Sequence, residues 1–117
     1  MREPIRDISR LHHIDESIDR VFRFMQGKTY DDLCGDELLY YAVVKNMEMV
    51  GEAAYMLTKE FIAAHPSTPW RVIIAMRHVL VHGYYQVEKS EIWNVIKEDL
   101  PTLSIQIKDY ISTIGSE

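Results

Sequence analysis

The sequence predicts an all-α fold, an up-and-down four-helix bundle, on three observations. Apolar residues recur at intervals of three and four over four long stretches, which is the period of one helical face. Only five glycines and four prolines interrupt the 117 residues, so the chain has few of the breaks that a many-stranded fold requires. The segments between the stretches are short, as in antiparallel bundles. One domain over residues 1–117 is expected for a chain of this length.

The first helix is expected at residues 3–26, and Gly27 is placed to end it. One face of this helix is apolar. The opposite face carries arginines interleaved with acidic residues, among them Asp7, Asp15 and Asp19. We expect these charges to be solvated and to pair with one another at i,i+4 spacing.

The second helix is expected at residues 37–64, with Asp36 as its N-cap. Gly51 lies in its interior, where a glycine costs about 1 kcal/mol relative to alanine. We therefore expect another helix to approach closely at Gly51. By its pattern alone, the adjoining Glu52 fits an exposed glutamate.

The third helix is expected to follow the loop at residues 65–69 and to continue to about His82. Thr68 as N-cap and Pro69 in the first turn predict its start, and Gly83 predicts its end.

The fourth helix is expected to begin near Glu88, and its apolar stripe continues to Ile114. Pro101 falls inside this stripe and has no N–H to bond back to Lys97. The sequence therefore predicts a kink or a restart at this point.

Charge and cysteine content limit the classes of function. The net charge is −5, from 13 basic and 18 acidic residues, whereas proteins that bind phosphate backbones by general attraction are usually basic. Nucleic acid would have to be bound at a local positive site or with a second subunit. The lone Cys34 excludes an intramolecular disulfide and fits a reducing compartment. No apolar run is long enough for a membrane span, so we expect a soluble cytoplasmic protein.

Residues 77–84 concentrate the side chains that could do chemistry. Arg77 lies on an otherwise apolar line of the third helix, and an unpaired guanidinium is costly to bury. It must reach a cleft, an acid or a subunit interface. His78 and His82 follow at i,i+4 spacing on a neighbouring face.

From the residues alone, three interpretations stay open. The arginine and histidines could be structural, each satisfied by a partner. His78 and His82 could bind zinc, although no third ligand is evident and the H-E-x-x-H pattern is absent. The third interpretation is metal-free phosphate chemistry, in which arginine stabilises charge and histidine moves a proton.

The order Arg77-x4-His82-x-Tyr84 resembles the R-x4-6-H signature of HEPN domains. More narrowly, it resembles the R-x4-H-x-Y motif of HepT, the toxin of HEPN–MNT toxin–antitoxin pairs. His78 stands where asparagine is common in that family. Three further landmarks match, so the resemblance covers nearly the whole chain: they are Val50-Gly51-Glu52-Ala53-Ala54, Pro69-Trp70 and Asp99-Leu100-Pro101.

The resemblance implies a HEPN helical bundle that forms a homodimer and brings two motifs into one cleft. It implies an endoribonuclease that needs no metal or other cofactor. His82 would move the proton of the ribose 2′-hydroxyl or of the leaving 5′ oxygen. Arg77 would stabilise the negative charge on the phosphate, and His78 would orient either the phosphate or Arg77. The product would carry a 2′,3′-cyclic phosphate.

The resemblance also implies a partner, an MNT-type nucleotidyltransferase antitoxin similar to MntA. This enzyme would transfer AMP from ATP to Tyr84 and so inhibit the toxin. Glu52 is the expected acidic partner of Arg77, within one chain or across the dimer. Two alternatives are a non-catalytic HEPN module that binds nucleotide or serves as the interaction subunit of a nucleotidyltransferase, and a purely structural dimerisation bundle.

Overall fold

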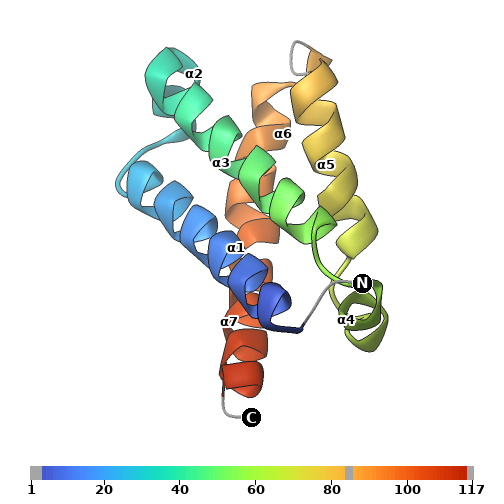
Figure 1. Cartoon of the computed structure of the whole chain (residues 1–117). Coiled ribbons are helices and arrows are strands. Elements are labelled where there is room, and N and C mark those ends of the chain that lie inside the picture. The colour runs from blue at the N-terminus through green and yellow to red at the C-terminus, as the bar shows by residue number, and fades with distance from the viewer. Residues whose placement is uncertain (1–3, 84–85, 116–117) are drawn as a thin grey trace.

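A computed structural model describes residues 4–83 and 86–115, which form helices joined by short loops (Figure 1). Over these residues no strand occurs, and the predicted all-α class is confirmed. The elements in chain order are α1 (Pro4–Met25), α2 (Tyr30–Gly35), α3 (Glu37–Tyr55), α4 (Lys59–Ala64), α5 (Trp70–Gly83), α6 (Lys89–Asn94), the π-helix η2 (Val95–Asp99) and α7 (Leu100–Gly115).

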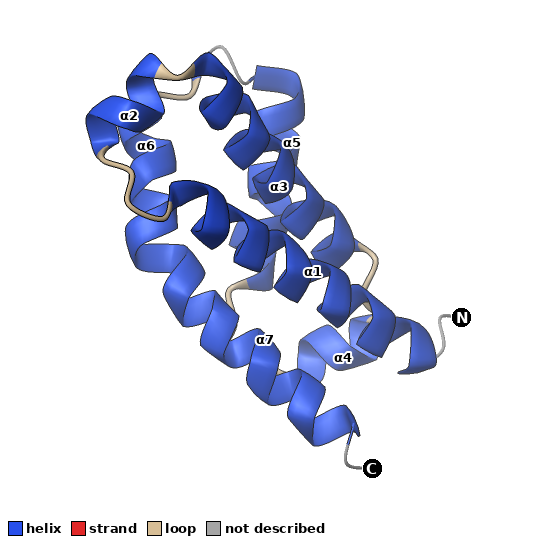
Figure 2. Cartoon of the chain, turned by 90° about the vertical axis from the view of Figure 1, so that its left-hand side faces the viewer, coloured by secondary structure: helices blue, strands red, loops and turns tan. Residues whose placement is uncertain are grey.

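Helix α3 packs against both α1 and α5, and α7 covers the other side of α1 (Figures 1 and 2). The principal neighbour of α5 is α3, so much of the surface of α5 stays open. The core lies between α1, α3 and α7 and consists of aliphatic side chains that are almost fully buried. Its main members are Leu11, Ile14, Ile18, Val21, Val43, Met47, Val50, Leu100 and Ile107. None of the helices in the described ranges is long and apolar enough to cross a membrane.

The prediction of one continuous helix over residues 37–64 is wrong. Helix α3 ends at Tyr55, and α4 starts after Thr58, which acts as its N-cap. The Thr58 hydroxyl accepts a hydrogen bond from the Phe61 N–H at 3.1 Å. The backbone N–H and the hydroxyl of Thr58 in turn donate to the Asp7 carboxylate at 2.8 and 2.7 Å. A buried acceptor on α1 therefore fixes the corner between α3 and α4.

The prediction of a solvated acidic face on the first helix is also wrong for Asp7. This side chain is only 5% exposed, because it fills the corner at Thr58. Asp15 and Asp19 form their ion pairs with Lys108 of α7 and not with neighbours in their own helix. The hydrogen bond to Asp15 is the main cause that raises the pKa of Lys108, because an anionic partner favours the charged ammonium. These acids attach α1 to other elements.

The segment after the first helix contains the short helix α2, which the sequence did not predict. Gly27 ends the first helix as expected and adopts a φ of +74°. Thr29 and Asp32 form a capping box, with hydrogen bonds of 2.8 and 3.1 Å between each side chain and the backbone N–H of the other. Asp36 caps α3 as predicted and accepts from the Leu39 N–H at 3.1 Å.

The irregularity predicted at Pro101 is present as a π-helix. The N–H of Leu100 donates to the carbonyl of Val95, five residues back. The next residue, Pro101, has no N–H that could donate to the carbonyl of Lys97. Helix α6 therefore continues into α7 through η2 rather than as a straight α-helix.

We predict that Asp7→Ala lowers the free energy of unfolding by about 1–3 kcal/mol, because two buried donors of Thr58 lose their acceptor. Urea denaturation measures this loss. Asp19→Ala is the matched control, because its side chain is 49% exposed and its bridge to Lys108 is worth about 1 kcal/mol or less. Equal losses for the two variants would contradict the role of Asp7.

Candidate active site

Helix α5 carries the predicted site and is anchored at its start by aromatic packing. Trp70 is buried, and its indole N–H donates to the His65 carbonyl at 3.0 Å. Thr68 was predicted to cap this helix, but its hydroxyl donates to Gln106 at 2.9 Å and lies 2.5 Å from the Tyr110 hydroxyl. The start of α5 is therefore attached to α7 rather than capped by Thr68.

Helix α5 crosses α3 at Gly51, and Arg77 lies at the crossing. A Cβ atom placed on Gly51 would overlap the Cβ of Arg77 and would lie 3.0 Å from the Ile73 carbonyl oxygen. Only glycine permits this separation of the two backbones. The close approach predicted at Gly51 is confirmed, and the approaching element is the helix that carries the motif.

Arg77 is not buried alone. Its Nε lies 2.9 Å from Oε2 of Glu52, and the two side chains are 38% and 50% exposed. The side chain of Arg77 therefore extends to the surface, where its guanidinium forms an ion pair with a carboxylate of α3. The sequence left open whether this acid belongs to the same chain, and the structure places it there. That Glu52 supports catalysis stays a prediction.

His78 and His82 are both exposed and lie one turn apart on α5. Their ring centroids are 4.6 Å apart, with the rings tilted by 50°. No group of three or more His, Cys, Asp or Glu side chains positioned for a metal ion occurs in the described ranges. Solvent-exposed imidazoles of this kind can exchange protons with a bound substrate.

Arg77 and His82 leave α5 in different directions. Successive residues of an α-helix are rotated by about 100°, so two residues five apart point about 140° away from each other. Both are accessible to a ligand, but on different sides of α5. Tyr84, the predicted AMP acceptor, and its neighbour Tyr85 lie outside the described residues.

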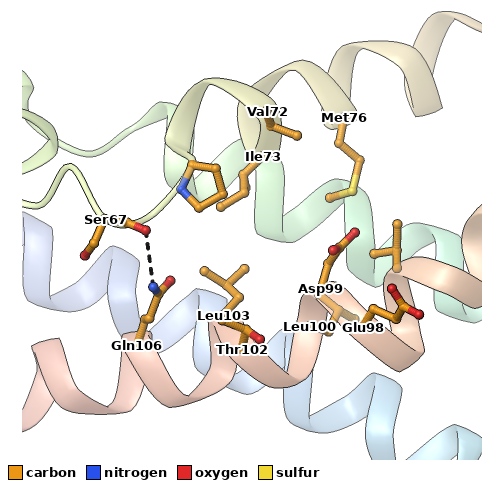
Figure 3. A pocket seen from close by; sticks show the side chains of 12 residues that line it. Ser67, Val72, Ile73, Met76, Glu98, Asp99, Leu100, Thr102, Leu103 and Gln106 are labelled. Atoms are coloured by element: carbon orange, nitrogen blue, oxygen red, sulfur yellow. Dashed lines mark hydrogen bonds between the residues drawn. The ribbon is translucent and has the colours of Figure 1, made fainter.

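A groove of about 370 Å³ lies between the first half of α5 and the η2–α7 segment (Figure 3). Val72, Met76 and Leu103 give it an apolar lining, and Glu98 and Asp99 bring carboxylates to one end. Neither Arg77 nor His82 lines this groove. Phosphate chemistry is therefore not assigned to it.

A second hollow, here called the α1–α3 cleft, has a volume of about 280 Å³, and its lining combines charged residues with the apolar Met49, Ala53 and Met56. Arg10, His13, Ser17 and Arg20 line it from α1, and Glu52 lines it from α3. Sequence reasoning treated Arg10 as part of a solvated charged face and assigned no role to His13, Ser17 or Arg20. Their spacing of three, four and three places them on one face of the helix, and this was the signal that could have found them.

Comparisons with known proteins point to one family. The family model described as "Ribonuclease HepT-like" matches residues 14–110. The chain is 33% identical over 93 residues to a protein named "Probable ribonuclease HepT" in Thermococcus cleftensis, covering 80% of this chain and 84% of that protein. It is 34% identical over 101 residues to a protein named as a putative RNase in Caldanaerobacter subterraneus subsp. tengcongensis, covering 86% and 90%. A comparison with solved structures found no significant match.

We predict that Gly51→Ala lowers the free energy of unfolding by about 1–3 kcal/mol, because the added methyl group overlaps Arg77 at the crossing. Gly35→Ala is the control, since a Cβ there meets nothing within 4 Å. This second change should be neutral or stabilise by up to about 1 kcal/mol. Urea denaturation compares them, and a neutral Gly51→Ala would contradict the close approach.

Proposed function

The chain belongs to the family of HepT-like ribonucleases, and on that premise we propose that it is an endoribonuclease, the toxin of a HEPN–MNT toxin–antitoxin pair. The observation that carries the proposal is the exposed arginine and histidine pair of the motif on α5, in a chain whose family match spans residues 14–110. The relatives are named as ribonucleases, which supports RNA as the substrate.

The proposed reaction uses the 2′-hydroxyl of the substrate as the nucleophile. His82 takes the proton of this hydroxyl, the 2′ oxygen forms a bond to phosphorus, and the bond to the 5′ oxygen breaks. A proton returned to the 5′ oxygen completes the step and leaves a 2′,3′-cyclic phosphate and a free 5′-hydroxyl. Arg77 stabilises the charge on the phosphate oxygens, and His78 orients the phosphate. No metal ion is required by this sequence of steps.

A homodimer would complete the site. Arg77 and His82 of one copy point away from each other, so convergence on one phosphate requires groups from a second copy or a substrate that wraps around α5. Val81 is exposed on the same side of α5 as Arg77, which supports a contact between copies there. Two arginines at such a contact would also give an acidic protein a local positive site.

We propose that an MNT-type nucleotidyltransferase acts as the antitoxin by attaching AMP to Tyr84, two residues after His82. The adduct would bring bulk and negative charge to the end of the motif. An RNA phosphate would then be excluded both sterically and by repulsion.

We predict that the protein cleaves RNA in the presence of EDTA and that His82→Ala lowers the cleavage rate by about 10²–10⁴-fold, the usual contribution of a general acid or base. Arg77→Ala should lower it similarly through weaker charge stabilisation. His12→Ala is the matched control, because His12 is an exposed histidine of α1 outside both hollows and should leave the rate unchanged.

Two further observations would decide between this proposal and a non-catalytic module. Cleavage products should end in a 2′,3′-cyclic phosphate, and a 2′-deoxy residue at the cleaved position should stop the reaction. Equal cleavage of DNA, or a His82→Ala variant as active as wild type, would reject the mechanism.

We predict that co-expression with the antitoxin adds the mass of one or more adenylate groups and that Tyr84→Phe removes the addition. Mass spectrometry of the intact protein measures this directly. An adduct that persists on Tyr84→Phe would move the acceptor, and Tyr85→Phe is the next variant to test. Tyr55→Phe serves as a control with an exposed tyrosine on α3.

A further inference from the structure

The α1–α3 cleft contains a guanidinium whose position is fixed by neutral partners. The Nε of Arg20 donates to the Asn46 side-chain oxygen at 2.8 Å, and a terminal nitrogen donates to the Ser17 hydroxyl at 3.2 Å. Asn46 is buried, and its amide nitrogen donates to the Ala42 carbonyl at 2.8 Å. This last bond sets the orientation of the amide, so its oxygen must face Arg20. The guanidinium is thus held in place before any ligand binds.

The two arginines of this cleft are not in an ion pair inside the described part of the chain. Neither Arg10 nor Arg20 has a carboxylate within ion-pair distance there. Glu52 also lines the cleft, but its carboxylate is engaged by Arg77. Glu16 contributes the remaining acid and is exposed at the rim. Two half-buried arginines beside His13 therefore leave a site that favours an anion.

The cleft adjoins the candidate active site through one shared residue. A single side chain, Glu52, lines the cleft on one side and binds the Nε of Arg77 at 2.9 Å on the other. An extended chain of phosphates that has one phosphate at Arg77 can therefore place further phosphates along the cleft, beside Arg10 and Arg20. Successive phosphates of single-stranded RNA meet this requirement, whereas a small isolated anion would use only one of the two positions.

We infer that the α1–α3 cleft is a second phosphate subsite, in which Arg10 and Arg20 bind the RNA backbone next to the cleaved position. This inference rests on the proposed ribonuclease function and extends it to substrate binding. The two arginines are positioning residues, because they would hold the strand without touching the reacting atoms. Arginine suits this task, since its planar donors match phosphate oxygens.

The test measures binding without cleavage, using a fluorescein-labelled single-stranded 2′-O-methyl oligonucleotide of about 12 residues, a length within the range of single-strand binding sites. Arg10→Ala combined with Arg20→Ala should raise the Kd by about tenfold or more. The slope of log K against log salt should fall by about 0.7 for each phosphate that the variant no longer binds. Arg23→Ala removes one positive charge from an exposed position of α1 outside the cleft and should change neither quantity.

A second variant is needed because Arg20 contacts the buried Asn46, so that Arg20→Ala could disturb the fold. Arg10→Glu leaves that contact intact and should also raise the Kd and lower the salt slope, with an unchanged thermal unfolding midpoint. An unchanged Kd and slope in both variants, or an equal weakening in Arg23→Ala, would overturn the inference. Wild-type protein that does not bind the oligonucleotide would overturn it as well.

The subsite and the proposed function fail in different ways. If wild-type protein cleaves RNA while the arginine variants bind normally, the subsite is wrong and the ribonuclease proposal stands. If binding depends on Arg10 and Arg20 but no RNA is cleaved, the subsite stands and the proposed chemistry is wrong.

Discussion

The contact between the backbone of α3 at Gly51 and Arg77 of α5 is the constraint on which the candidate site depends. Without a side chain on Gly51, the two helices approach until the Arg77 Cβ rests on the α3 backbone. At this separation the Arg77 side chain is long enough for its guanidinium to reach Glu52, the residue after Gly51 on α3. A wider separation would take the carboxylate out of reach. The glycine thus determines where the arginine emerges.

The ion pair with Glu52 prepares Arg77 for an anion rather than occupying it fully. It uses the Nε atom, and a guanidinium has five N–H donors in a planar fork. The remaining donors are oriented because Nε is held, which reduces the conformational entropy lost when a phosphate binds. Exposure of 38% and 50% keeps the pair in contact with water, so its energy is modest and a phosphate can compete for the arginine.

The sequence predicted the features that depend on nearby residues and missed those that depend on distant ones. Spacing along one helix located Arg77, His78 and His82, and the cost of an interior glycine predicted the crossing at Gly51. The break at Thr58 was missed because its partner, Asp7, is 51 positions earlier in the chain. A single threonine in an apolar pattern gives no signal that its hydroxyl will bind a buried carboxylate from a distant part of the chain.

The same distinction explains the missed features near the site. The cleft residues of α1 share a helical face, but their function as a group depends on Asn46 of another helix, which fixes Arg20. Thr68 has the residue type of an N-cap, yet its hydroxyl binds Gln106 and Tyr110 on α7. Short α2 was missed for a different reason. Its Thr29 and Asp32 are three apart and carry a local capping signal, but residues 28–35 were interpreted as a connection and the signal was not used.

The divergence of Arg77 and His82 limits how the proposed catalyst can be built. In a contact with two-fold symmetry, a residue at one position of the first copy faces a residue at another position of the second, and the reverse holds at the same time. If the α5 helices of two copies cross in this way, Arg77 of each copy can face His82 of the other, which forms two equivalent sites. Val81, four residues after Arg77 on the same side of α5, would be covered by the same crossing. A single arrangement would then cover an exposed apolar side chain of α5 and bring together two motif groups that leave the helix in different directions.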